Sequence, residues 1–279
     1  MKNTFSKTGP LDRIDDVHFV EQGPIDGQPI LLVHGLAASL HDWDLLIPEL
    51  AAASYHAYAL DLLGHGESPK PASRAYKAKW VYRHFARWIE SLHLSQAPIL
   101  LGHSFGGYLC MRYAVRHAEN VRALILTSPF YKLEQLPLLL QRAYRRPLLN
   151  VLIVEHTPEW VFRWLIDLTN IALGRTGGAT LTLPEPIRRQ TALDYKRTAP
   201  GAFNIPNTVR DLTPSLARLA MPTLVLWGDR DQTLNPASFP ALVRALPNAR
   251  GHALSGGHVP HQSNPAEYNR LVLNFLATL

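Results

Sequence analysis

Short runs of continuously apolar residues recur along the chain and alternate with longer segments of helical periodicity. The predicted strands are 30–34, 55–61, 98–103, 121–127, 223–227 and 250–254, and the predicted helices are 39–53, 76–93, 104–117, 236–246 and 264–278. Runs such as ILLVH and TLVLWG are apolar on both alternating faces, as a strand buried between two helix layers must be. The pattern predicts an α/β fold with a mostly parallel sheet flanked by helices.

The alternation stops between residues 130 and 206. This segment contains no convincing central strand but has amphipathic helical stretches at 133–149 and 158–172. Because the alternation resumes after it, we interpret 130–206 as a helical cap, or lid, at the carboxyl edge of the sheet. The core is then formed by residues 1–129 and 207–279.

The composition is that of a globular protein with a large core. A chain of 279 residues buries most of its surface, and 47% of the residues are hydrophobic while 18% are charged. The single cysteine, Cys110, excludes an intramolecular disulfide and is consistent with a reducing compartment. The N-terminal residues lack the apolar stretch of a secretory signal, and no window reaches the ~18 apolar residues of a membrane span. We therefore expect a soluble, cytoplasmic protein.

The net charge of +6 is concentrated in the predicted cap. The segment from Phe130 to Pro206 contains ten Lys and Arg residues and six Asp and Glu residues, which gives it a net charge of +4. The excess could attract an anionic substrate, an acidic partner or a membrane surface, but charges scattered this widely favour a solvated helical face. No basic cluster is interleaved with base-stacking aromatic residues, so we expect no nucleic-acid partner.

Ser104 stands between glycines in the string Gly102-His103-Ser104-Phe105-Gly106, after an apolar run and before a helical segment. A serine hydroxyl is a poor nucleophile, so an enzyme must expose it, supply a base and stabilise the oxyanion that follows attack. A sharp strand-to-helix turn exposes the side chain and needs glycines two residues before and after it. The context favours a nucleophilic serine over a flexible turn, and a phosphate-binding loop is disfavoured because its Lys-Ser/Thr ending is absent.

Four further motifs accompany the Ser104 turn in a fixed order. They are His34-Gly35, the octapeptide DLLGHGES at 61–68, Gly228-Asp229-Arg230-Asp231 and Gly256-Gly257-His258, all at the ends of predicted strands. Together they resemble the α/β-hydrolase fold superfamily, in particular serine esterases and lipases with a helical lid. The resemblance covers nearly the whole chain, and only the predicted cap matches nothing specific.

The resemblance implies a catalytic triad. Ser104 is the nucleophile, and His258, in a Gly-Gly-His turn after the last predicted strand, is the base ahead of its neighbour His261. The spacing Gly-x-x-Asp selects Asp231 as the acid that orients His258, with Asp229 as the runner-up. Either aspartate could instead cap its own turn.

The resemblance also implies an oxyanion hole made by the backbone N–H groups of Leu36 and Phe105. The aromatic face of the predicted cap is expected to close an apolar pocket, although most of its residues would serve packing alone. The predicted substrate-binding residues are His34, His103, Tyr131, Trp160 and Trp164. We expect no metal, since the His258 and His261 pair lacks a third ligand at suitable spacing, and no cofactor.

These features predict a serine hydrolase that acts on carboxylic esters, or on related lactones or thioesters, as small-molecule substrates. Dehalogenases and epoxide hydrolases of the superfamily use an aspartate nucleophile, whereas position 104 is serine. Carbon-carbon bond hydrolysis is a weaker alternative on the same triad, and cofactor-free haloperoxidase or perhydrolase activity is another. A small-molecule receptor on the hydrolase scaffold is the alternative without turnover. The sequence leaves the oligomeric state open.

Overall fold

The computed structural model describes residues 16–73, 76–144, 152, 154–177 and 182–279. Within them, seven strands form one sheet in the order β1-β3-β2-β4-β5-β6-β7. The strands are β1 (Phe19–Gln22), β2 (Gln28–Val33), β3 (Tyr55–Leu60), β4 (Ile99–His103), β5 (Ala123–Thr127), β6 (Thr223–Gly228) and β7 (Ala249–Leu254). Only β1 pairs antiparallel; every other neighbouring pair is parallel.

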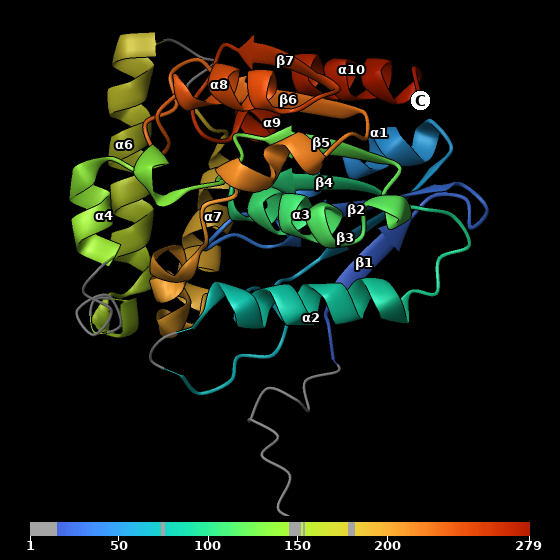
Figure 1. Ribbon diagram of the computed structural model, residues 1–279. Helices are drawn as coiled ribbons and strands as arrows, with labels where there is room; N and C mark the ends of the chain where they lie inside the picture. The colour runs from blue at the N-terminus through green and yellow to red at the C-terminus, as the bar shows by residue number, and fades with distance from the viewer. Residues whose placement is uncertain (1–15, 74–75, 145–151, 153, 178–181) are drawn as a thin grey trace, which may run out of the picture.

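Helices cover both faces of this sheet (Figure 1). They are α1 (Ile47–Ala52), α2 (Ala78–Ser91), α3 (Phe105–Arg116), α4 (Leu138–Tyr144), α6 (Glu159–Gly177), α7 (Glu185–Arg197), α8 (Ser238–Ala245), α9 (Pro260–Ser263) and α10 (Pro265–Leu276). On one face α2, α3 and α8 pack against alternate strand residues such as Leu31 and Leu100. On the other, α1 and α10 pack against the intervening residues, such as Leu32 and Leu101. Burial on both faces explains why the central strands are continuously apolar.

The predicted α/β architecture is confirmed, and the six predicted strands correspond to β2 through β7. The sequence did not reveal β1, because all four of its residues are exposed and carry no apolar pattern. It also did not reveal α7, a helix with only two buried residues, Ala192 and Asp194. β1 is the terminal strand of the sheet and most residues of α7 are not fully buried, so neither element has the apolar pattern of the central strands.

Between β5 and β6 the chain forms α4, α6 and α7, which lie beyond the carboxyl ends of the parallel strands (Figure 1). The helical stretch predicted at 133–149 is described only as far as Tyr144, and residues 145–149 lie outside the described part. The division into a core and a separate cap at residues 130 and 206 stays a prediction. None of the helices described is both long enough and apolar enough to cross a bilayer.

Candidate active site

Ser104 occupies a tight turn between the end of β4 and the start of α3. Its φ of 50° and ψ of −113° lie in a region that residues with a Cβ rarely adopt. The turn is held by hydrogen bonds from Ser104 N to Thr127 O (2.9 Å) and from Phe130 N to Ser104 O (3.0 Å). A Cβ on Gly106 would lie 2.1 Å from Val33 O, so only glycine permits this approach of α3 to β2. The local fold therefore presents the Ser104 hydroxyl at the carboxyl edge of the sheet.

Asp231 and His258 come from the loops after β6 and β7 and are joined directly. His258 Nδ1 lies 2.7 Å from Asp231 Oδ2, while Asp231 Oδ1 accepts hydrogen bonds from the amides of Thr233 (2.8 Å) and Leu234 (2.9 Å). Burial alone would raise the pKa of Asp231, but the charge of His258 and these hydrogen bonds hold it below its usual value. An ionised Asp231 fixes the His258 tautomer that leaves Nε2 free to accept a proton.

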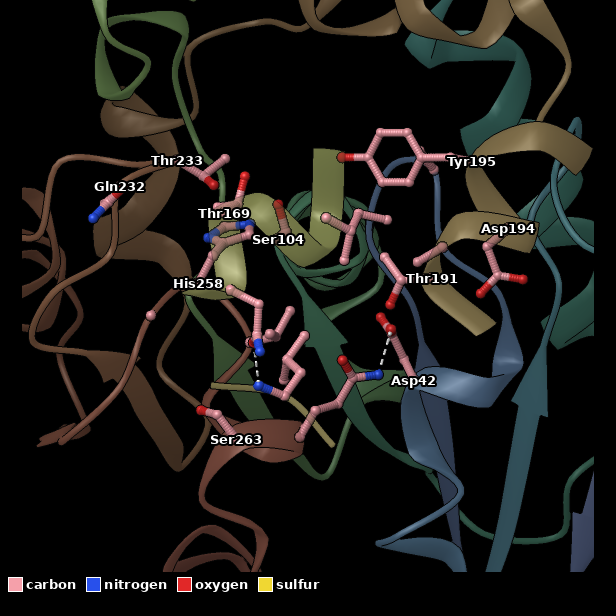
Figure 2. A pocket seen from close by; sticks show the side chains of 18 of the residues that line it. Asp42, Ser104, Thr169, Thr191, Asp194, Tyr195, Gln232, Thr233, His258 and Ser263 are labelled. Carbon is pink, nitrogen blue, oxygen red and sulfur yellow. Dashed lines mark hydrogen bonds between the residues drawn. The ribbon is translucent and has the colours of Figure 1, made fainter. Parts of the chain in front are cut away.

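Ser104 and His258 line the same cavity, which has a volume of about 500 Å³. Figure 2 shows the two side chains next to each other on one side of it, with Asp194 and Tyr195 on the other. In the described part of the chain no hydrogen bond joins Ser104 to His258. Such contacts are often long in free enzymes and shorten when substrate binds.

Asp229, the runner-up for the acid, has a different position. Its Oδ1 accepts a hydrogen bond from Gly256 N (3.1 Å) and lies 3.4 Å from Arg230 Nε, and about half of its side chain is exposed. These contacts tie the loop after β6 to the loop after β7. The structure therefore brings Asp231, and not Asp229, to His258.

Leu36 and Phe105, whose amides are the predicted oxyanion donors, both lie close to Ser104 in the structure. Leu36 lines the cavity, and a Cβ on the preceding Gly35 would lie 3.3 Å from Ser104 Cβ. Phe105 is the first residue of α3, where a backbone N–H has no partner within the helix. Among the described residues, neither amide donates a hydrogen bond to another protein group. The role of these two amides as an oxyanion hole stays a prediction.

A second histidine and aspartate pair lies behind the first. His103 Nδ1 is 3.0 Å from Asp42 Oδ2, and His103 Nε2 is 3.2 Å from the backbone oxygen of His258. Gln262 Nε2 donates to Asp42 Oδ1 at 3.2 Å. Burial opposes ionisation of Asp42, but His103 and the nearby histidines hold its pKa well below the usual value. His103 therefore lies between Asp42 and the backbone of His258, within hydrogen-bond distance of both.

His261 packs beside this pair, stacked on Trp43 with ring centroids 4.9 Å apart. Burial lowers the pKa of His261 to about 3, so the ring is neutral. Ligand atoms of Asp42, His103 and His261 lie within 4.8 Å of one another, a spacing that could hold a metal ion. A metal there would displace the hydrogen bond between His103 and Asp42. The expectation of no metal stays a prediction.

Of the five predicted substrate-binding residues, the structure brings only His103 to the cavity. His34 is fully buried; its Nδ1 lies 2.7 Å from Gly35 O and its Nε2 accepts from Leu62 N at 3.0 Å. Tyr131 is buried and donates to Ser238 O at 3.2 Å. Both side chains support loops and do not reach the cavity, so this part of the prediction needs correction.

The same correction applies to Trp160 and Trp164 on α6. Their exposed fractions are 70% and 59%, and they point away from the cavity, because helical periodicity directs other residues of α6 toward it. The cap side of the cavity is lined instead by Phe162, Leu165 and Ile166 from α6 and by Thr191, Asp194 and Tyr195 from α7.

The contribution of α7 was missed from the sequence. Pro184-Glu185-Pro186 is typical of a helix start, and this signal could have revealed it. Burial raises the pKa of Asp194, which accepts a hydrogen bond from Gln190 Nε2 at 2.9 Å, to about 7. The cavity wall opposite Ser104 therefore includes a carboxyl group that is readily protonated near neutral pH.

The sequence model of the alpha/beta hydrolase fold family matches residues 28–265. The chain belongs to this family. Lipase 1 of Psychrobacter immobilis is 25% identical, over 88% of this chain and 76% of the lipase. The haloalkane dehalogenase of Mycobacterium marinum is 26% identical, over 92% of this chain and 87% of the dehalogenase.

Among solved structures, an esterase from Thermogutta terrifontis superposes with a TM-score of 0.76 at 22% identity, covering 94% of this chain and 93% of the esterase. That similarity shows the fold alone. The family match and these relatives establish an α/β-hydrolase, whereas the names of the relatives span several kinds of substrate.

Proposed function

We propose that this α/β-hydrolase is a serine hydrolase that cleaves carboxylic esters, or the related lactones or thioesters, through an acyl-enzyme intermediate. The observation that carries the proposal is the cavity shared by Ser104, on its strained turn, and His258, whose Nδ1 lies 2.7 Å from Asp231 Oδ2. A nucleophile, a base and an orienting carboxylate on the loops at one sheet edge are the groups that acyl transfer needs.

In the proposed mechanism, His258 Nε2 accepts the proton of Ser104 as the serine oxygen attacks the substrate carbonyl carbon. The carbonyl oxygen becomes an oxyanion, which the amides of Leu36 and Phe105 stabilise; removal of one such donor typically costs roughly 3 kcal/mol of barrier. The protonated His258 then donates to the leaving alcohol. His258 then takes a proton from a water molecule, which attacks the acyl carbon, and gives that proton to the Ser104 oxygen as the bond to the acyl group breaks and the acid leaves.

The residue at position 104 separates this proposal from aspartate-nucleophile chemistry. The chain resembles a haloalkane dehalogenase about as closely as it resembles a lipase. Dehalogenases of this superfamily attack with an aspartate carboxylate, and the turn here carries a serine hydroxyl. A hydroxyl that transfers its proton to histidine favours attack on an activated carbonyl.

Substitution of Ser104 by Ala tests the proposal. We expect Ser104→Ala to abolish both steady turnover of p-nitrophenyl esters and covalent labelling by an organophosphate. The panel should cover short and long acyl chains, a homoserine lactone and a thioester, so that it also reports the preferred substrate. Labelling that persists in Ser104→Ala would refute the role of Ser104. A single slow turnover by the wild type would favour the receptor alternative.

A further inference from the structure

A second cavity, with a volume of about 390 Å³, lies between α2, α3 and the segment that follows α7. Its position is remote from the candidate active site: Arg116 follows Ser104 by twelve residues along α3, which corresponds to about 18 Å of helix. None of its lining residues also lines the first cavity. The two cavities are therefore separate sites.

Cationic side chains dominate this second cavity. It is lined by Lys77, Lys79, Arg83, Arg112, Arg116 and Arg210, together with Tyr82 and Thr208. No aspartate or glutamate is among the lining residues. We call this set of residues the basic cavity. Its cations come from three segments far apart in the sequence, which the packing of α2 against α3 brings together (Figure 1).

The cations of the basic cavity differ from other cations of the protein in their ion pairing. In the described part of the chain none of the six forms an ion pair, whereas Arg163, Arg188 and Arg197 elsewhere all do. The nearest acidic residue in sequence, Asp211, instead accepts a hydrogen bond from Thr213 N at 2.8 Å. Like charges gathered without counter-charges repel one another, so an anion bound among them would relieve a cost that the free protein bears.

The walls of the basic cavity hold the cations in place. The guanidinium groups of Arg112 and Arg116 lie over the ring of the buried Tyr82, at 4.4 Å and 5.2 Å from its centroid. These cation-π contacts reduce the freedom of two long side chains, and therefore the entropy lost when they bind a ligand.

The N-terminus of α2 adds positive potential at the same place. Lys77 is its N-cap residue, Ala78 N donates to Thr208 Oγ1 at 2.8 Å, and the first turn has no acidic residue. Because no acidic side chain of the first turn offsets the positive end of its dipole, this helix of 14 residues favours a nearby anion. The helix end and the six side chains thus act in the same direction, although they are independent features of the sequence.

We propose that the basic cavity binds a ligand that carries phosphate groups, with at least two negative charges. Planar guanidinium groups match the oxygen geometry of phosphate and can donate two hydrogen bonds to it. The ligand is either a free phosphorylated small molecule or the phosphate of a lipid headgroup, and the chemistry of recognition is the same for both. This proposal is independent of the proposed ester hydrolysis.

Inorganic pyrophosphate and lipid vesicles are the probes that test the proposal. We expect pyrophosphate at millimolar concentration to raise the Tm of the wild type by several degrees, or vesicles of phosphatidylglycerol, but not of phosphatidylcholine, to sediment the protein. The first result identifies a free phosphorylated molecule as the source, and the second identifies a lipid headgroup.

The matched variants each remove three positive charges. Arg83→Gln/Arg112→Gln/Arg116→Gln should lose at least two thirds of the response, and the control Arg244→Gln/Arg250→Gln/Arg270→Gln, at exposed positions elsewhere, should keep it. If the first variant folds poorly, Lys77→Gln/Lys79→Gln changes only exposed side chains and should halve the response. Equal responses in the cavity variants and the control, or no response to either probe in the wild type, would overturn the proposal.

Discussion

Two aspartates at the site each contact the Nδ1 atom of a histidine, and the two histidines differ in the surroundings of their other ring nitrogen. His258, held by Asp231, opens onto the cavity beside Ser104. His103, held by Asp42, turns its other nitrogen to the backbone oxygen of His258. In the proposed mechanism the first pair moves a proton to or from the substrate, whereas the second pair contacts the backbone that carries His258.

The first prediction concerns Asp231. Asp231→Asn keeps an oxygen for the amides of Thr233 and Leu234 but removes the charge that orients His258. We expect kcat for ester hydrolysis to fall roughly 10³ to 10⁴-fold with little change in Tm. Asp229→Asn, in the same loop, is the matched control and should keep kcat within about tenfold of the wild type. A larger loss of kcat in Asp229→Asn than in Asp231→Asn would show that Asp229, and not Asp231, orients His258.

The second prediction compares a buried pair with an exposed one. Asp42→Asn removes a buried carboxylate that both His103 and Gln262 contact, so the free energy of unfolding should fall by about 3 kcal/mol. Asp44→Asn breaks the similar pair with His41, whose side chains are 57% and 45% exposed, and should cost less than about 1 kcal/mol. Urea denaturation at pH 7 measures both. Equal losses would show that burial gives the Asp42 and His103 pair no greater effect on stability than the exposed pair has.

At the scale of elements, α7 connects the region after β5 to the core through Asp194. Ser39 and Asp42 in the core, His41, and Gln190 on α7 itself all interact with this carboxyl, yet burial has the largest effect and raises its pKa from 3.8 to about 7. Between these two pH values the folded protein binds more protons than the unfolded chain. The free energy of unfolding therefore falls as pH rises from about 4 to about 7.

The third prediction follows from this decrease of the free energy of unfolding with rising pH. Asp194→Asn removes the charge that α7 must bury above pH 7, so it should stabilise the protein at pH 8 by at most about 4 kcal/mol, and much less at pH 5. Urea midpoints of the wild type and the variant at both pH values measure the difference. The exposed carboxylate Asp211 gives the control, Asp211→Asn. A stability difference that does not depend on pH would contradict the burial of Asp194.

At the scale of the whole molecule, one sheet separates two hydrophobic cores, and consecutive strand residues contribute to different cores. Leu100 packs with α2, α3 and α8, whereas Leu101 packs with α1 and α10, and both are fully buried. The stability of either core therefore depends on the same central strands.

The fourth prediction uses this division. Leu100→Ala and Leu101→Ala should each lower the free energy of unfolding by about 2 to 5 kcal/mol, and each variant should still unfold in one transition, since the sheet couples both cores. Leu138→Ala, at a position 69% exposed on α4, should change it by less than about 0.5 kcal/mol. Circular dichroism and tryptophan fluorescence should report the same midpoint for each variant. Separate transitions would show that the cores unfold independently.

The sequence by itself determined the parallel sheet and the turn at Ser104, and its resemblance to the α/β-hydrolases pointed to Asp231 and His258 as the other members of the proposed triad. Burial on both faces makes each central strand apolar throughout, and a turn such as that at Ser104 needs glycines at fixed positions. Each feature can therefore be predicted from residues that are neighbours in the sequence. Only the tertiary structure decided what surrounds them. The edge strand β1 and the helix α7 have too few buried side chains to produce a clear apolar pattern in the sequence. Which side of α6 faces the cavity depends on how that helix packs. The Asp42 and His103 pair and the basic cavity join residues far apart in the chain, and spacing along a sequence carries no record of such contacts.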